Sequence, residues 1–481
     1  MTNRTFHSVF WTGLERFGMQ IFQALFTIIL ARLLLPSDYG LIAMIFIFLM
    51  GGQIVIDAGL PIALMQKKNP TETDFSTVFW FNIMSGLFFY GIFFFCATPI
   101  ADFYEQPLLN PIIKVAGLNF IAWSFGLVHA TKLNINLGFK RQAFISITAV
   151  IISGGIGIIL AYYGYGVWAL VTQFLINNTL RSLFFWLFGI RWFPKFIFQF
   201  ASLKSLLPVG FASIFAAFLD TIYKNIYAIF IGKRYSAAEL GFFQQGNTLS
   251  SLVTAQITYA ITTSFIPLQS KHHDYPDEQQ KLFFRFLSLL CFLIFPLAIL
   301  FLVLAEPFVS FILTEKWLPT VPLIQILCLS LLLYPISVIN NRILLVKGLS
   351  KQLLTIESIK KAFGFMAFFI CLPHGISWIC ASIGFYVLFS AILSIIYSQK
   401  ILSIQWTEQL KIVFPILGLA VFSGIAAWCA MMGVKFYAPT NDFLKLLCGG
   451  ISGIGIYVLG GHLLKFNEIR FALDYLKKKR P

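Results

Sequence analysis

Charged residues are scarce in this chain. Only 11% of its 481 residues are Asp, Glu, Lys or Arg, whereas 58% are hydrophobic. An ordinary soluble domain carries about 25% charged residues, so a water-soluble protein of this length would lack the polar surface to cover itself. The mean hydropathy of +0.83 agrees. The composition excludes a soluble globular protein and predicts an all-α, polytopic membrane protein.

Common catalytic and metal-binding signatures are also missing. The sequence contains no G-x-x-x-x-G-K-[ST], no H-E-x-x-H and no G-x-S-x-G, which argues against a P-loop ATPase, a zinc protease and a serine hydrolase. Its seven cysteines fall in apolar runs without a C-x-x-C pair, as small core residues do. The longest polar loop, Gln269–Leu282, is short, whereas an envelope polymerase or ligase needs a larger extramembrane region. We therefore expect no enzyme, no metal and no cofactor.

Fourteen apolar runs approach the ~20 residues that a helix needs to cross a bilayer. Glu15 and Arg16 interrupt the first run, so we expect it to remain as a helix rather than be cleaved as a signal peptide. The eleventh run is the weakest, because Lys360 and Lys361 lie near its start. The predicted spans are Val9–Leu30, Leu41–Leu60, Val78–Pro99, Leu109–Ala130, Phe144–Tyr163, Gly166–Gly189, Leu207–Gly232, Phe242–Leu268, Phe283–Ala305, Val321–Val346, Ile356–Leu372, Ile376–Tyr397, Ile412–Met432 and Phe443–Leu464.

The basic residues predict the orientation of these spans. With the N-terminus inside, 25 of the 35 Lys and Arg fall in inside segments, 6 in outside joints and 4 within spans. Short cytoplasmic loops carry an excess of Lys and Arg, so both termini are predicted to be cytoplasmic. The net charge of +16 is then mostly a signal of topology, and nucleic acid is not an expected partner. The tail "YLKKKRP" fits a solvated anchor better than a lipid-binding site.

Part of the sequence occurs twice. The stretch "ILARLLLPSDYGLIAM" begins at Ile29, and "IFIGKRYSAAELGFFQ" begins at Ile229; an offset of 201 places Asp38 on Glu239 and Gly40 on Gly241. Two weaker echoes follow in the same order. They are "PIIK" from Pro111 with "PLIQ" from Pro322, and "GFKRQ" from Gly138 with "GLSKQ" from Gly348.

These echoes predict an internal repeat of six spans. Because six is even, the two copies have the same orientation in the membrane, as in parallel-repeat transporters. We therefore predict an N-lobe over residues 1–200, a C-lobe over 201–400, and an appendage over 401–481 with spans thirteen and fourteen and a basic tail. Two such lobes are expected to leave a cleft that opens to either side in turn, which is the behaviour of a carrier.

Seven ionisable residues fall inside predicted spans. A charge at the bilayer centre costs about 2.5–3.5 kcal/mol on insertion scales, so such residues face a protein interior or a wet cavity. Several polar amides, Asn82, Asn119, Asn177 and Asn178 among them, share these spans and would suit a sugar or join helices. The seven are Glu15, Arg16, Asp57, Lys114, Arg181, Asp220 and Lys224.

Each charge has a structural and a functional interpretation. Asp220 and Lys224 share a helix face and form either an internal ion pair or a site with an anion-binding lysine and a coupling acid. Glu15, Arg16 and Lys114 lie near span ends, from which side chains can snorkel to the interface, and for Asp57 a structural role is favoured. Arg181 lies deeper, and the planar fork of arginine matches phosphate.

The residues of the first repeat also carry a resemblance. "LARLLLPSDYGLIAM", "DAGLPIALMQKK" and "TETDFSTVFWFN" over Ala31–Asn82, with "FYEQPLL" at Phe103–Leu109, resemble the polysaccharide transporter family of the MOP exporter superfamily. That family includes the Wzx-type oligosaccharide flippases, and the colanic-acid-exporter-like branch is the most similar. The resemblance implies a bacterial inner-membrane flippase for oligosaccharide units on undecaprenyl diphosphate, in the synthesis of O-antigen, capsule or exopolysaccharide.

The predicted lobes and the charges inside the spans, rather than a family motif, supply candidate residues for this function. We expect Arg181, Lys224, Lys114 and Arg16 to bind the diphosphate, and Asp220 or Glu15 to couple transport to H⁺ or Na⁺. Expected partners are the lipid-linked oligosaccharide, membrane lipids, and polysaccharide polymerase and chain-length proteins. Two alternatives stay open: a lipid II flippase or multidrug/cation antiporter of the same superfamily, and an envelope polymerase or ligase.

Overall fold

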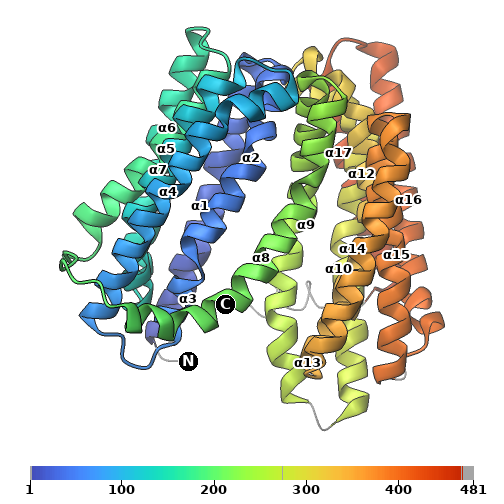
Figure 1. Ribbon diagram of the computed structural model, residues 1–481. Helices are drawn as coiled ribbons and strands as arrows, with labels where there is room; N and C mark the ends of the chain where they lie inside the picture. Colours follow the sequence, from blue (N-terminus) through green and yellow to red (C-terminus); the bar gives the residue numbers. More distant parts are fainter. Residues whose placement is uncertain (1–2, 273–274, 403, 467, 470–481) are drawn as a thin grey trace. The chain divides into compact units, whose positions relative to one another are not determined.

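The described part of the protein is helical. The computed structural model describes residues 3–272, 275–402, 404–466 and 468–469, and no strand occurs in these ranges (Figure 1). Some side chains within the helices lie outside the described set, including those of Arg16, residues 209–220 and Lys224. The prediction of an all-α protein is confirmed.

The helices group into two compact units, Met1–Gly241 and Phe242–Pro481. In the first unit α1 packs on α6, α4 on α5, α7 on both α5 and α6, and α8 on α2, α3 and α4. A π-helical turn, Phe185–Gly189, extends α7. The helices of this unit are α1 (Asn3–Leu33), α2 (Pro36–Asp57), α3 (Leu60–Gln66), α4 (Glu72–Tyr104), α5 (Leu109–Ile135), α6 (Phe139–Tyr162), α7 (Val167–Phe184), α8 (Phe200–Arg234) and the first turn of α9 (Ala237–Lys271).

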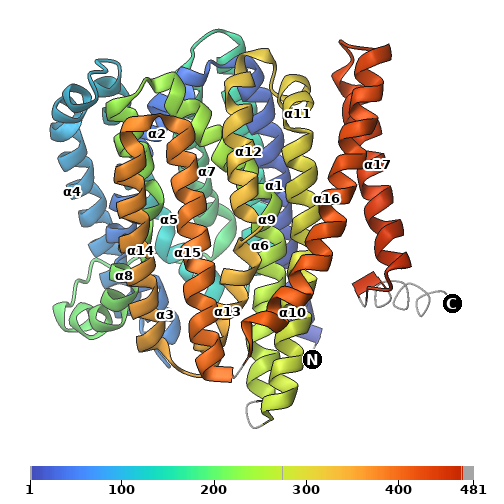
Figure 2. The same cartoon turned by 90° about the vertical axis from the view of Figure 1, so that its right-hand side faces the viewer.

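The second unit contains the rest of α9 and the helices that follow it. Here α10 packs on α16, and α15 contacts α12, α13 and α14. Figure 2 shows α17 beside α16. The helices of this unit are α10 (Pro276–Val303), α11 (Ala305–Ile312), α12 (Val321–Leu331), α13 (Tyr334–Val346), α14 (Ser350–Cys371), α15 (Ile376–Leu402), α16 (Trp406–Tyr437) and α17 (Asp442–Leu463), with 3-10 turns at Glu315–Thr320 and Leu372–His374.

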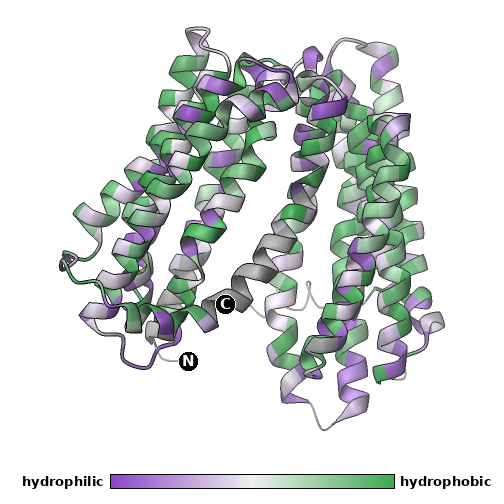
Figure 3. Ribbon diagram, in the orientation of Figure 1, coloured by the Kyte–Doolittle hydropathy of each residue, from purple (hydrophilic) through white to green (hydrophobic). Residues whose placement is uncertain are grey.

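Each predicted span lies, apart from a residue or two at its ends, within one helix or two consecutive helices, and many of these helices extend several residues beyond the span. Among the described residues, eight helices are long and apolar enough to cross a membrane, and ten if each of two bent pairs counts as one span. Figure 3 shows apolar residues along the helices and polar residues mainly at their ends. The prediction of a multi-pass membrane protein is confirmed, whereas the count of fourteen spans stays a prediction.

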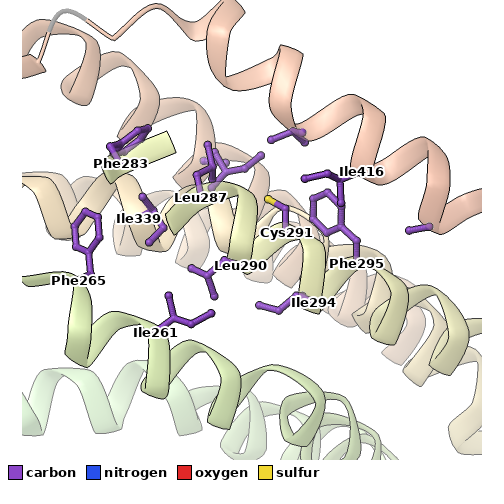
Figure 4. Close-up of a cluster of buried hydrophobic side chains, with 14 of the residues drawn as sticks. Ile261, Phe265, Phe283, Leu287, Leu290, Cys291, Ile294, Phe295, Ile339 and Ile416 are labelled. Carbon is purple, nitrogen blue, oxygen red and sulfur yellow. The ribbon is translucent and has the colours of Figure 1, made fainter. Parts of the chain in front are cut away.

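The core of the second unit forms around one face of α10. Phe283, Leu287, Leu290 and Ile294 are fully buried, and their spacing of three or four residues places them on one side of the helix. Side chains from other helices of this unit pack against this face (Figure 4). They include Ile261 and Phe265 of α9, Ile339 of α13 and Ile416 of α16.

The tenth predicted span is broken. The segments Glu315–Leu331 and Tyr334–Val346 meet at an angle of 42°. Pro335 lies at the start of the second segment, where its ring would clash with the carbonyl group four residues earlier in a continuous helix. The bend between α12 and α13 therefore has a local cause in this proline.

The two copies of the first repeat share one local geometry. Asp38 accepts a hydrogen bond from the N–H of Leu35 at 2.9 Å, and Glu239 accepts one from the N–H of Ser236 at 3.0 Å. Both acids therefore stabilise the start of the helix that follows, α2 and α9 respectively. The same bond from a backbone N–H to a carboxylate therefore occurs at both helix starts, 201 residues apart.

The glycine of each copy of the first repeat lies against a backbone carbonyl group of the other copy. A Cβ atom on Gly40 would lie 1.7 Å from the carbonyl oxygen of Ala237, and one on Gly241 would lie 1.9 Å from that of Pro36. Since Ala237 and Pro36 are themselves 201 residues apart, the contact is reciprocal. Only glycine permits this approach of α2 to the start of α9.

The later echo has a different register from the one that the sequence suggested. Leu137 and Gly348 both have positive φ angles, 55° and 71°. The next N–H groups, of Gly138 and Leu349, bond the carbonyls of Leu133 and Leu344, each at 2.9 Å. Both helix ends are thus Schellman motifs, and the matching offset is 211 rather than 210. The sequence alignment paired two glycines, but only one of them occupies the left-handed position.

Candidate functional site

The structure places the intramembrane charges on five helices. The described side chains are those of Glu15, Asp57, Lys114 and Arg181, whereas Arg16 (α1), Asp220 and Lys224 (both α8) lie outside the described side chains. The predicted pairing of Asp220 with Lys224 therefore stays a prediction. Of the described charges, the structure brings three together and leaves one apart.

Arg181 borders a small cavity between α5 and α7. The cavity measures about 90 Å³, and Trp123, Gly126, Asn178 and Phe185 are among the residues that line it. The guanidinium carbon Cζ lies 5.9 Å from the ring centroid of Trp123 and 5.6 Å from that of Phe185. Arginine stacks readily on such aromatic faces, so the two rings hold the guanidinium at the edge of the cavity.

One donor of Arg181 remains unused. Its Nε atom is buried and has no hydrogen-bond partner among the described residues. Buried polar groups in native proteins are nearly always bonded to protein or water. A guanidinium carries five N–H donors in a fixed fork. An unused buried donor beside a cavity is what a site for an oxyanion requires.

Two acids join Arg181 in what we call the Arg181 cluster, comprising Glu15, Asp57, Trp123 and Arg181. Glu15, only 4% exposed on α1, is the acid whose charge acts on the guanidinium. Ser146 of α6 donates a hydrogen bond to Glu15 at 3.0 Å. The indole Nε1 of Trp123 donates to Asp57 at the end of α2, at 2.7 Å. The cluster therefore links α1, α2, α5 and α7.

Amide side chains extend this polar interior. Asn178, on the wall of the cavity, donates from Nδ2 to Asn119 Oδ1 at 2.6 Å, and Asn177 donates to Ser153 Oγ at 3.1 Å. Asn82 on α4 is fully buried, and neither polar atom of its side chain has a partner among the described residues. The bonds of Asn119, Asn177 and Asn178 therefore join helices, which is one of the two roles expected for the amides.

Lys114 lies away from the Arg181 cluster. Its ammonium group is 5.0 Å from the ring centroid of Phe94. It precedes Trp123 by nine residues on the same helix, a distance of about 14 Å along the axis at 1.5 Å per residue. The structure does not bring Lys114 and Arg181 to one site.

A second polar cluster was missed in the sequence. It consists of the "TETDFST" stretch at the start of α4, which reaches the segment between α7 and α8. Its two acids accept side-chain hydrogen bonds, Glu72 from Trp192 Nε1 and Asp74 from Ser202 Oγ. Its hydroxyl groups accept backbone hydrogen bonds, Ser76 from the N–H of Lys195 at 3.0 Å and Thr77 from the N–H of Gln199 at 3.1 Å. Lys132 and Lys67 neutralise the two acids at 2.7 and 2.6 Å. The signal was the T-x-x-D capping box at Thr71, which the structure contains.

The fold and the buried residues define a class: a helical, multi-pass membrane protein with ionisable and amide side chains in the interior of its first unit. A family model described as "polysaccharide biosynthesis protein" matches residues 29–322, more than half of the chain. The chain belongs to this polysaccharide biosynthesis family, and the predicted family is confirmed.

Known relatives extend over nearly the whole chain. The teichuronic acid biosynthesis protein TuaB of Bacillus subtilis (strain 168) is 22% identical over 475 residues, 96% of this chain and 91% of TuaB. The succinoglycan biosynthesis transport protein ExoT of Rhizobium meliloti (strain 1021) is 23% identical over 493 residues, 98% of this chain and 96% of ExoT.

A solved transporter has the same fold. The structure of the lipid II flippase MurJ in an inward closed conformation superposes with a TM-score of 0.77 at 14% identity, and the match covers 95% of this chain and 98% of MurJ. At this identity the likeness concerns the fold alone. It agrees with the predicted fold of a helical, multi-pass membrane protein.

Proposed function

We propose that this protein is a flippase that moves undecaprenyl-diphosphate-linked oligosaccharide units across the bacterial inner membrane, for the synthesis of a surface polysaccharide. The observation that carries the proposal is the buried Arg181 beside a cavity, with an Nε donor that no described residue accepts. Family membership supports the polysaccharide, and the fold shared with a lipid II flippase supports a lipid-linked substrate.

Arg181 suits a diphosphate for two reasons. Its fork of donors can bind two phosphate oxygens at once. The apolar rings of Trp123 and Phe185 lie beside it, and such surroundings strengthen the attraction between opposite charges. Arg16 and Lys224 remain in the proposed diphosphate set. We leave Lys114 out of it, because it lies far from Arg181 on α5.

Glu15 is our proposed coupling group, with Asp220 as the second candidate. Its carboxylate acts on Arg181 and is buried. Binding of H⁺ or Na⁺ to Glu15 would weaken its hold on the guanidinium and free Arg181 for the diphosphate. Release of the cation would then favour release of the substrate. In this proposal the exchange accompanies alternating access, with both termini in the cytoplasm.

The first test is made in a deletion strain of the source bacterium. We expect complete lipid-linked oligosaccharide units to accumulate on the cytoplasmic leaflet, and wild-type protein to restore their transfer. Complete units that still reach the periplasm while polymer is missing would refute the flippase and favour a polymerase or ligase. Accumulation of lipid II instead would favour the lipid II flippase.

The second test concerns the site. Loss of a charged hydrogen bond costs about 1.5–3 kcal/mol, so Arg181→Gln should bind the lipid-linked substrate roughly 10- to 100-fold more weakly, with Arg181→Lys in between. Lys114→Gln is the matched control, since it removes one intramembrane positive charge away from the cluster. Equal transport by Arg181→Gln and Lys114→Gln, at equal amounts of folded protein, would overturn the assignment.

A further inference from the structure

The segment between the π-helical turn and α8 exposes an unusual surface. Residues 190–204 read "IRWFPKFIFQFASLK". Residues 191–198 form neither helix nor strand. Four phenylalanines point outward: Phe193 is 76% exposed, Phe196 92%, Phe198 48% and Phe200 68%. Scattered exposed apolar residues are ordinary, but a contiguous set of large ones marks an interaction site.

Side chains of α4 hold this segment in place. The indole of Trp80 donates to the carbonyl oxygen of Lys195 at 2.9 Å and stacks on Phe196 with ring centroids 5.1 Å apart. The N–H groups of Lys195 and Gln199 donate to Ser76 and Thr77. The exposure of the phenylalanines is therefore a property of a fixed backbone.

The same bonds suit a water-poor environment. Non-helical backbone can enter the apolar part of a bilayer only where protein groups satisfy its N–H and C=O groups. Here serine and threonine hydroxyls and a tryptophan indole supply partners to three backbone groups of the segment. The segment can thus lie at the boundary of headgroups and acyl chains with its aromatic rings pointing into lipid.

The charges of the segment have one sign. Arg191, Lys195 and Lys204 are all exposed, and residues 190–204 contain no acid. The acids of α4 form their hydrogen bonds with other residues: Glu72 with Lys132 and Trp192, and Asp74 with Lys67 and Ser202. Lys195 interacts with Glu72 through its charge, but the ion pair of Glu72 is formed with Lys132. The three positive charges are therefore available to an anionic partner, and they lie on the side predicted to be cytoplasmic.

We propose that residues 190–204 form an interfacial segment that binds anionic phospholipids of the bilayer, with the phenylalanines among the acyl chains and the three basic residues at the headgroups. Aromatic residues beside Lys and Arg are the composition of surface-bound membrane segments. The "TETDFST" stretch presents this segment to the lipid. The proposal is independent of which substrate is transported.

Lipid binding is tested by native mass spectrometry of the full-length protein, titrated with phosphatidylglycerol or phosphatidylcholine. We expect wild-type protein to prefer phosphatidylglycerol. Each basic residue near an anionic surface contributes about a fivefold factor, so Arg191→Gln/Lys195→Gln/Lys204→Gln should reduce that affinity roughly 100-fold. The matched control is Lys271→Gln/Lys281→Gln/Lys411→Gln, which removes three exposed charges elsewhere. Equal losses in both variants, or no lipid preference in wild type, would overturn the proposal.

Photo-crosslinking tests the position of the aromatic face with an aromatic replacement. Phe196 is replaced by benzoylphenylalanine, a larger aromatic residue at a 92% exposed position, in liposomes of phosphatidylcholine with one quarter phosphatidylglycerol. We expect lipid adducts enriched in phosphatidylglycerol above its bulk share, and adducts of bulk composition from the control position Phe436, which is 82% exposed. Absence of lipid adducts at position 196, or adducts of bulk composition there, would refute the proposal.

Discussion

Replacing Gly40 by alanine should force apart two helices that touch through their backbones. The new Cβ atom would lie 1.7 Å from the carbonyl oxygen of Ala237. The closest ordinary carbon–oxygen contacts are about 3.3 Å, so α2 and the start of α9 must separate by about 1.5 Å. Inserting an atom into a packed contact costs about 1–3 kcal/mol. The obstacle is backbone and cannot rotate away, so we expect the upper end of this range.

Helix propensity offsets part of this cost. Gly40 lies within α2, where alanine is about 1 kcal/mol more favourable than glycine. The net loss is then about 2 kcal/mol, which for a unit of this size lowers the Tm by roughly 4–8 °C. Gly241→Ala should have a similar effect, because its Cβ atom would lie 1.9 Å from the carbonyl oxygen of Pro36.

The double variant sharpens the reasoning. Once one Cβ atom has separated the helices, the second finds space already open. Gly40→Ala/Gly241→Ala should therefore lose clearly less stability than the sum of the single losses, by about 1 kcal/mol or more. Fully additive losses would show that the two glycines act through separate contacts.

The assay is thermal unfolding of the purified protein in detergent, followed by intrinsic fluorescence, together with transport in liposomes. Gly91→Ala on α4 is the control, because no atom lies within 4 Å of the added Cβ; its Tm should equal or exceed that of wild type. If Gly40→Ala unfolds at the same temperature as Gly91→Ala, the close approach is not what requires glycine, and the argument is wrong.

Three further substitutions test other parts of the first unit. Ser202→Ala removes the hydroxyl that donates to Asp74 and should cost about 1–3 kcal/mol because a buried acceptor loses a partner, seen as a lower Tm. Gly126→Ala should lower the Tm and weaken substrate binding, since its Cβ would lie 2.4 Å from the Ser182 hydroxyl beside the cavity. A hydrogen bond from Lys233 lowers the pKa of the exposed Glu105. The ion pair therefore stabilises the fold at neutral pH, and this effect is lost as the pH falls through the lowered pKa. Glu105→Gln should lower the Tm slightly at pH 7 in low salt, but not at acidic pH or in 1 M salt.

Matched controls accompany these substitutions. Ser205→Ala removes a hydroxyl that bonds only within its own helix, so its Tm should stay near wild type; an equal fall for Ser202→Ala and Ser205→Ala would contradict the role of the "TETDFST" stretch. Gly155→Ala on α6, with no atom near the added Cβ, is the control for Gly126→Ala. A salt-independent effect of Glu105→Gln at pH 7 would show that a contact other than the ion pair is lost.

Much of the fold could be predicted because membranes impose simple rules. A run of about 20 apolar residues has few alternatives to a helix in lipid, and all fourteen predicted spans lie on helices. The shared geometry at Asp38 and Glu239 could also be predicted, since short capping motifs are local. The later echo was placed one residue out of register because a glycine in the sequence does not reveal whether its φ angle is positive.

The site could be predicted only in part. Arg181 and Glu15 stood out because charges are rare within spans, but their proximity depends on how α1, α6 and α7 pack. The bond from Trp123 to Asp57 joins residues 66 positions apart, and no sequence spacing signals it. The same holds for the "TETDFST" bonds, which reach about 120 residues along the chain.

The reciprocal contact at Gly40 and Gly241 has a consequence for genetics. Each glycine faces a main-chain oxygen, which is present whatever residue occupies positions 237 or 36. A defect caused by Gly40→Ala therefore cannot be relieved by any side-chain change at Ala237, and the same is true of Gly241→Ala and Pro36. A suppressor screen should return true revertants, or changes elsewhere that let α2 shift, and leave both partner positions untouched. Both glycines should therefore be constrained in evolution, because a substitution at either one cannot be compensated by a substitution at its partner position.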